Sequence, residues 1–273
     1  MTITQQTSER LLLAVGRLDA SARLAPAGLA RLLELRAAVV PFGAGPDGMI
    51  ALLRGDREGE AALCEHFDNL LASNGAPLEF AVADGLALAQ LALVAAAREE
   101  GSDSAAAGTT GTTGTGTGTG TGAVAAALAC TTSLWRGGAL GGPWLTLPIN
   151  DGLHRIALLG TPEAWLAASA LALEHEAAAV LNGLTRARER LATDEIKVAA
   201  IGRASYSALD LFHLLADRLM LTIGEAADVL GQTIPTAGAA MVRLEQLGVA
   251  REVTGRARSR AFAYRALING VAP

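Results

Sequence analysis

The chain has 273 residues, of which 51% are hydrophobic, 4% aromatic and 18% charged, and its formal net charge is −5. This length suffices for one large or two ordinary domains whose core needs no disulfide bond or metal ion. The acidic total excludes a polyanion-binding surface over the whole molecule, so a surface of that kind has to be local.

The cysteines and the apolar runs indicate a reducing, aqueous compartment. Cys64 and Cys130 have no metal-ligand spacing, and no signal peptide is visible, which predicts a cytoplasmic protein. The longest apolar run, residues 80–97, contains Asp84 and Gln90. It is shorter and more polar than a membrane span, so we expect a buried helix and no membrane partner.

Residues 1–105 are predicted to form an N-terminal helical region. Its Pro and Gly residues predict a loop at residues 41–48. Apolar periodicity predicts helices over residues 8–23, 29–39, 56–72 and 80–100.

Residues 106–123 are predicted to form a Gly/Thr low-complexity linker, because a nearly pure Gly-Thr tract buries little apolar surface and is costly to order. Gly118, Gly120 and Ala123 match the loose G-x-G-x-x-A pattern of a phosphate-binding loop. No predicted strand precedes them and no Lys-Ser/Thr pair follows, so we predict no nucleotide cofactor there.

Residues 124–200 are predicted to form a second helical region. Thr161 is the cap and Pro162 the first residue of a long helix that we expect to run to Leu191. Arginines at 186, 188 and 190 suit the negative end of such a helix. A short further turn is expected over residues 193–201.

Residues 201–273 carry the most informative pattern. After a helix over residues 206–219, Thr222 and Glu225 form a capping box and Gly231 supplies a helix stop. A second helix starts at Thr233, with Pro235 in its first turn, and closes at Gly248.

A β-hairpin follows, with strands at residues 249–253 and 261–264 and a turn at Thr254-Gly255. Helix, tight turn, helix and hairpin is the plan of a winged helix-turn-helix, which places its second helix in the major groove of DNA. We therefore predict a mainly α fold, a helical bundle plus a C-terminal winged helix-turn-helix, with β structure confined to a small hairpin wing.

The hairpin is a local positive patch, with five arginines against Glu252. Such cations supply sequence-independent affinity for phosphates. The helical register turns Thr236, Gly238, Ala239, Val242, Arg243 and Gln246 outward, and the polar ones among them can reach base edges. The predicted DNA-binding residues are Thr233, Thr236, Arg243, Gln246, Arg251, Arg256, Arg258 and Arg260.

Several segments share their sequence pattern with a known protein family. LGQTIPTA (230–237), RLEQLG (243–248) and REVTGR (251–256) resemble the C-terminal winged helix of many bacterial Fic-family proteins, and GTPEAWL (160–166) is similar to the start of the long helix that precedes it. Gly238 and Ala239 depart from the pattern, since relatives often have Asn and Lys there. That departure weakens base readout more than phosphate contact.

Residues 147–155 also show a shorter similarity to the Fic family, because they partly match its signature H-P-F-x-D/E-G-N-G-R. Pro148, Asp151-Gly152 and Arg155 are kept in order, and a helix is expected after them at residues 156–159. The family's catalytic His falls on Leu147, which has no lone pair to act as a base. The resemblance thus implies a degenerate Fic-like protein that has lost nucleotidyl transfer from ATP to a target hydroxyl.

No other pattern indicates catalysis. None of His66, His154, His175 and His213 lies at metal-ligand spacing, and no serine or cysteine sits in a nucleophile motif. We predict no catalytic residue, cofactor or metal.

The leading hypothesis is a non-enzymatic, DNA-binding transcriptional regulator that binds double-stranded DNA as a homodimer, because single winged helices read short sites. The alternative is a catalytically inactive Fic-like protein whose winged helix is a protein-interaction module. A third hypothesis is a residual Fic-type enzyme with His154 as the base. Steep salt dependence favours the first, and binding of ATP and Mg²⁺ near Asp151 favours the third.

Overall fold

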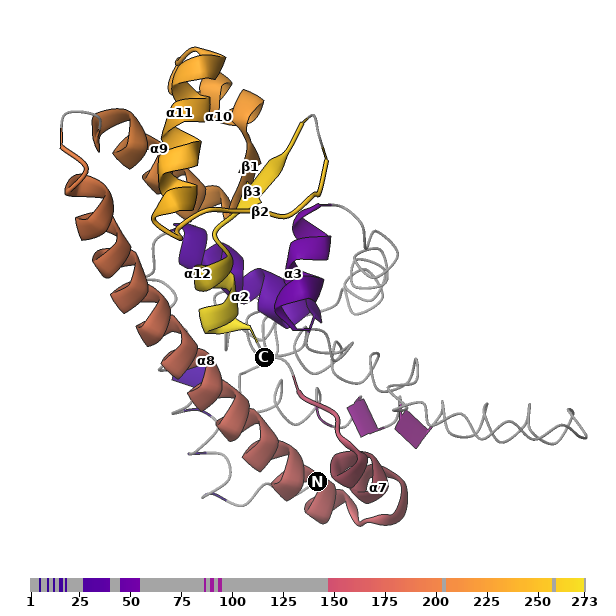
Figure 1. Ribbon diagram of the computed structural model, residues 1–273. Helices are drawn as coiled ribbons and strands as arrows, with labels where there is room; N and C mark the ends of the chain where they lie inside the picture. Colours follow the sequence, from indigo (N-terminus) through magenta and orange to yellow (C-terminus); the bar gives the residue numbers. More distant parts are fainter. Residues whose placement is uncertain are drawn as a thin grey trace, which may run out of the picture. The chain divides into compact units, whose positions relative to one another are not determined.

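The computed structural model describes residues 27–39, 45–54, 147–202, 205–256 and 259–272, with single residues in 5–18 and 86–94. Within these residues the chain forms eight helices and one three-stranded antiparallel sheet near the C-terminus (Figure 1). The predicted mainly α fold with a small amount of β structure is therefore confirmed. The predictions for residues 56–72 and for the Gly/Thr tract lie outside the described residues.

The chain divides into two compact units. The first contains Met1–Arg23, Ala37–Ala44 and Arg57–Ala179, and the second contains Leu24–Arg36, Gly45–Asp56 and Val180–Pro273. The second unit therefore joins two short N-terminal segments to the C-terminal third of the sequence.

In the first unit, helix α7 (Asp151–Leu159) and the start of α8 (Pro162–Ala199) pack on the segment that contains Leu86 and Gln90. The indole of the buried Trp165 donates to the carbonyl of Leu86 at 2.8 Å, and the Gln90 amide donates to the carbonyl of Ala157 at 3.2 Å. The described residues between 86 and 94 are helical, as predicted for residues 80–100.

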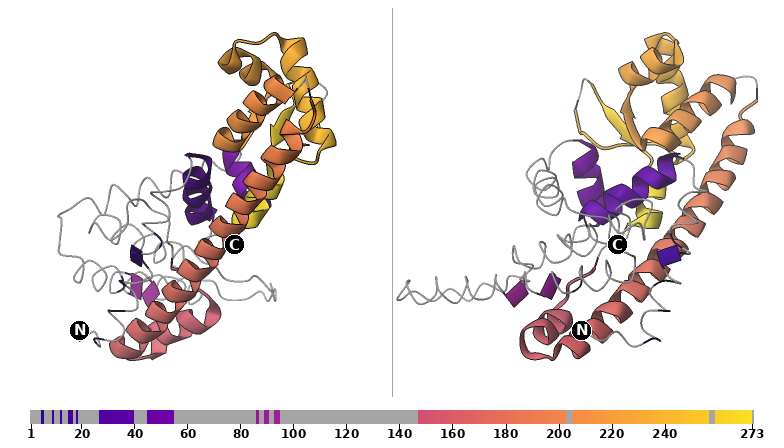
Figure 2. Two further views of the ribbon diagram at one scale, coloured as in Figure 1. Left: turned by 90° about the vertical axis from the view of Figure 1, so that its left-hand side faces the viewer. Right: turned by 180° about the vertical axis from the view of Figure 1, so that it is seen from behind.

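Helix α8 is one uninterrupted helix (Figure 2), and the predicted end at Leu191 is wrong. No glycine or proline lies between Leu184 and Ala199 to stop it. The Thr193 hydroxyl bonds the carbonyl of Glu189 at 2.8 Å, so this residue stays within the helix. The arginines at 186, 188 and 190 are therefore not at the helix end, where Lys197 lies instead.

Two N-terminal helices belong to the second unit. Helix α2 (Ala27–Val39) matches its prediction, whereas α3 (Pro46–Leu53) begins inside the predicted loop at residues 41–48. Pro46 occupies the first helical turn, where no intrahelical N–H is lost, and the acidic Asp47 suits the positive helix start. Arg265 of α12 (Arg265–Val271) forms an ion pair with Asp47, so α3 is tied to the last helix of the chain.

The C-terminal module, residues 205–272, follows the predicted order with two additions, a third strand and a final helix. Helix α9 (Ser205–Arg218) leads into strand β1 (Met220–Thr222), then α10 (Ile223–Leu230) and α11 (Ile234–Gln246), and the hairpin of β2 (Arg251–Glu252) and β3 (Ala261–Ala263) precedes α12. All three views show α9, α10 and α11 gathered beside the sheet (Figures 1 and 2).

The prediction that β structure is confined to the hairpin is wrong, because β1 adds a third strand and the sheet order is β1-β3-β2. Leu221 pairs with Phe262 across it, and both side chains are buried. Leu219 makes this strand possible: its left-handed backbone, with φ of 66°, ends α9 and turns the chain. A three-residue strand is too short for sequence periodicity to reveal.

The predicted helix caps of the module are confirmed. Thr222 and Glu225 form a reciprocal capping box, in which Thr222 N–H donates to the Glu225 carboxylate at 2.6 Å and Glu225 N–H donates to the Thr222 hydroxyl at 3.2 Å. Gly231 ends α10 with a φ of 60°, which glycine adopts without strain. Thr233 caps α11 and Pro235 lies in its first turn.

Among the described residues, α8 is the one helix long and apolar enough to cross a membrane, judged by length and composition alone. Of its most apolar stretch, 44% is buried inside the molecule. The buried core helix of a water-soluble protein meets the same test, so this helix is weak evidence for a membrane span.

Candidate nucleic-acid interface

Helix α11 buries one side and exposes the other. Ala237, Ala240, Met241 and Leu244 pack inward, within contact of α9 and α10. On the opposite side lies a row of exposed residues at helical spacing, which we call the outer stripe: Pro235, Ala239, Val242 and Gln246. The centre of this surface is small and apolar, and Gln246 is its polar end.

Two predicted base-facing residues lie beside the outer stripe and not on it. By the helical period, Thr236 and Arg243 share one flank, and Arg243 is half-buried. Thr233 and Thr236 are exposed, but they also hold the helix start. Their hydroxyls lie 2.8 Å apart, and Thr236 N–H donates to the Thr233 hydroxyl at 3.3 Å.

The described arginines of the wing, residues 251–260, are exposed to solvent. Arg251 on β2 and Arg256 and Arg260 in the loop are exposed, while Arg258 lies outside the described residues. The Arg260 guanidinium carbon lies 5.5 Å from the centre of the Phe262 ring, in the geometry of a cation–π contact. Within the part of the chain that the structure describes, these three arginines form no ion pair.

Glu252 organises the start of the wing loop, a role that the sequence analysis did not assign. Its carboxylate accepts the N–H of Thr254 at 2.8 Å, the N–H of Gly255 at 2.9 Å and the Thr254 hydroxyl. The Thr254 hydrogen bonds, with smaller help from Gly255 and Arg260, hold the pKa of Glu252 below its ordinary value. The carboxylate of the wing is therefore engaged with the wing's own backbone.

A further cation reaches the wing from α3. Arg54 caps the end of that helix, is exposed, and donates from Nη1 to the carbonyl of Val253 at 3.5 Å. The two residues are 199 positions apart, so no local sequence signal indicates this contact.

Charge is distributed unevenly over the module. From Arg251 to Arg265 there are five arginines and one glutamate, whereas α9–α11 contain two arginines and five acidic residues. Because exposed charges act over about 8–10 Å in physiological salt, the wing keeps a positive potential although the helices beside it are acidic.

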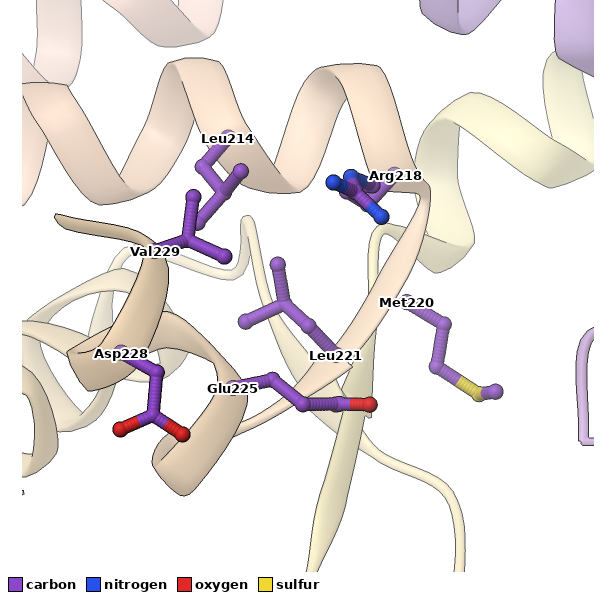
Figure 3. A pocket seen from close by; sticks show the side chains of 7 residues that line it. All are labelled: Leu214, Arg218, Met220, Leu221, Glu225, Asp228 and Val229. Carbon is purple, nitrogen blue, oxygen red and sulfur yellow. The ribbon is translucent and has the colours of Figure 1, made fainter.

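A shallow pocket of about 220 Å³ lies between α9, β1 and α10 (Figure 3). The side chains of Leu214, Leu221 and Val229 converge in it, and Arg218, Glu225 and Asp228 bring charges of both signs to its edge. Ligand sites usually enclose roughly 300–1,000 Å³, so this pocket is small for an effector.

The residues aligned with the Fic signature adopt a different local structure from the one expected. The helix begins at Asp151 and not at residue 156, so residues 151–155 lie inside α7. Asn150 is its cap and accepts the N–H of Leu153 at 2.9 Å, while its carbonyl accepts the N–H of His154 at 2.8 Å. These amides are already bonded and do not form a phosphate-binding turn. Leu147 is fully buried.

Within the described residues, no group of three or more His, Cys, Asp and Glu side chains is arranged to hold a metal ion. No protein-family model matches the chain, and no curated protein matches it significantly. The resemblance to the Fic family therefore stays a prediction from the sequence.

Proposed function

We propose that the C-terminal module is a winged helix-turn-helix that binds double-stranded DNA, and that the protein is a transcriptional regulator. The observation that carries the proposal is the wing, where exposed arginines with no ion pair among the described residues stand on a hairpin whose acid is bound to backbone amides. Cations in this state are ready to replace the counterions of DNA phosphates.

Helix α11 supports the proposal from the other side of the module. A capped helix after a tight turn, with one side packed on α9 and α10 and the other exposed, is what a major-groove helix requires. In this arrangement Arg251, Arg256, Arg258 and Arg260 contact phosphates, while Gln246, Thr236 and Arg243 face bases. A homodimer would bind two half-sites, so a selected site should be palindromic.

The apolar outer stripe favours one second candidate, in which α11 docks on a groove of another protein. Helix-in-groove recognition uses an apolar helix face of this kind. Charge-dependent binding to DNA separates the two candidates, because docking through the stripe does not need the wing arginines.

The test is fluorescence anisotropy of a labelled random duplex against the full-length protein over a salt series. We expect the logarithm of the affinity to fall against the logarithm of salt with a slope of about −3 to −5, as a few phosphate contacts require. The triple variant Arg256→Ala, Arg258→Ala and Arg260→Ala should lower this slope by about two to three and abolish most binding.

The matched control removes the same net charge elsewhere, with Arg31→Ala, Arg155→Ala and Arg188→Ala, all exposed and outside the module. This variant should keep the slope. Equal loss in both variants, or no binding of the wild type at low salt, would reject DNA binding through the wing and leave protein docking.

A further inference from the structure

The outer stripe of α11 consists mainly of small apolar side chains, which hydrogen bonding to bases does not explain. Pro235 and Ala239 are short, and Val242 leaves 45% of its surface exposed. In the first turn of the helix, Ile234 is 65% exposed, but by the helical period it lies on the flank opposite to Thr236 and Arg243, outside the stripe. A surface valine on a helix is not rare, but here Val242 lies on the helix face that a major groove would contain.

Thymine is the base that offers an apolar group in the major groove. Its 5-methyl group projects there, and small apolar side chains contact it, whereas guanine and cytosine present hydrogen-bonding atoms. Short side chains at Pro235 and Ala239 let the helix approach the base edges closely. Gln246 at the end of the stripe has the amide that pairs with adenine N6 and N7.

We propose that α11 recognises thymine 5-methyl groups through Ala239 and Val242, with Gln246 reading a neighbouring adenine. This inference rests on the proposed DNA binding and adds the class of sequence that is read. Arg243 lies on the flank and half-buried, so guanine readout contributes less to specificity than contact with thymine methyls.

The experiment begins with duplexes selected from a random library by the full-length protein. Each thymine of the selected site is then replaced in turn by uracil, which lacks the 5-methyl group and keeps every hydrogen-bonding atom. At the contacted positions we expect the affinity to fall about fourfold, the factor for removing one buried methyl group from an apolar contact.

Val242→Ala locates the contact. Its affinity for the thymine duplex should fall, and the loss caused by uracil should disappear at one position of the half-site, because the two groups interact only with each other. Val229→Ala is the matched control: this valine is 56% exposed on α10, outside the stripe, and its removal should leave the full uracil effect.

Three outcomes overturn the inference. If specific binding is retained with uracil at every position, the methyl groups are not read, and the DNA-binding proposal still stands. If Val242→Ala keeps the whole uracil effect, other residues read the methyl groups. If no duplex is bound at all, the inference and the proposed function both fail, and the stripe is a protein-docking surface.

Discussion

Asp194 is a buried carboxylate outside the wing. Its side chain is fully buried and accepts three hydrogen bonds, from Arg190 Nε at 2.6 Å, Lys197 Nζ at 2.7 Å and the Tyr264 hydroxyl at 2.9 Å. Tyr264 follows β3 and caps α12, so this carboxylate joins α8 to the sheet. Burial raises the pKa of Tyr264, which keeps its hydroxyl protonated as the donor.

Replacement of Asp194 by Ala should lower the free energy of unfolding by about 3 kcal/mol, because the buried Tyr264 hydroxyl is left without an acceptor and a charge-assisted pair is lost. Arg190 and Lys197 are each about two-fifths exposed, so water replaces part of what they lose. Urea denaturation measures the change, and Glu195→Ala, which breaks the exposed pair with His213, is the control with little expected loss.

The stability lost in Asp194→Ala should depend on pH, and the direction of this dependence follows from the pKa of Asp194. Burial alone raises the pKa of Asp194, but hydrogen bonds from Lys197, Arg190 and Tyr264 outweigh it and hold the pKa below 3.8, the ordinary value. A carboxylate whose pKa is lowered in the folded state stabilises the protein fully when the pH is above 3.8. This stabilisation is lost as the pH falls below 3.8 and through the lowered pKa of the folded state. The difference between wild type and Asp194→Ala should therefore shrink in acid, and a constant difference would contradict the assignment.

Among the elements, α10 shows how local chemistry defines a helix. It has eight residues, too few to be stable alone, and both of its ends are satisfied by specific caps. Thr222 is at once the last residue of β1 and the cap of α10, so the strand and the helix share one residue. The cap at Thr222 therefore sets the direction in which the chain passes from β1 into α10.

Thr222→Ala should destabilise the protein by about 1 kcal/mol, since it removes the oxygen that accepts the Glu225 N–H. Thermal unfolding followed by circular dichroism measures this effect. Thr193→Ala is the matched control in the interior of α8, where alanine is the better helix former and the threonine caps nothing. That variant should be unchanged or slightly more stable, and equal losses in both would mean that the cap has no special role.

At the scale of the molecule, the C-terminal module is completed by residues far away in the sequence. Arg36 of α2 is buried and donates to the carbonyl of Val271 at 3.0 Å, across 235 positions. A Cβ added at Gly28 would lie 1.8 Å from the carbonyl oxygen of Ala216, so α2 touches α9 backbone to backbone. The N-terminal helices are thus part of the body that carries the wing.

Gly28→Ala tests this contact, because the two backbones must separate to admit a methyl group. We expect a loss of about 1–3 kcal/mol in unfolding free energy, the usual cost of overpacking. Gly270→Ala is the control: this helical glycine of α12 has nothing within 4 Å of an added Cβ, so alanine should be neutral or stabilising there. If Gly28→Ala is also neutral, α2 does not pack on α9.

Sequence alone was enough for the parts of this protein that depend on neighbouring residues. Thr222, Glu225, Gly231 and Thr233 predicted the turn between α10 and α11 because caps act within one helical turn. The inward row Ala237, Met241 and Leu244 followed from helical periodicity. The apolar outer stripe was visible in outline as well, although its centre and its flanks were not distinguished.

The tertiary structure decided whatever depends on residues that are distant in sequence. Strand β1 exists because β3 supplies hydrogen-bonding partners some 40 positions later, and its three residues carry no periodic signal of their own. Arg54 lies beside the wing because α3 is tied to α12, and the Glu252 carboxylate accepts hydrogen bonds from the wing backbone. A pattern in the sequence indicates local conformational preference. These contacts form only when distant segments pack together, and burial of side chains determines which of them are stable.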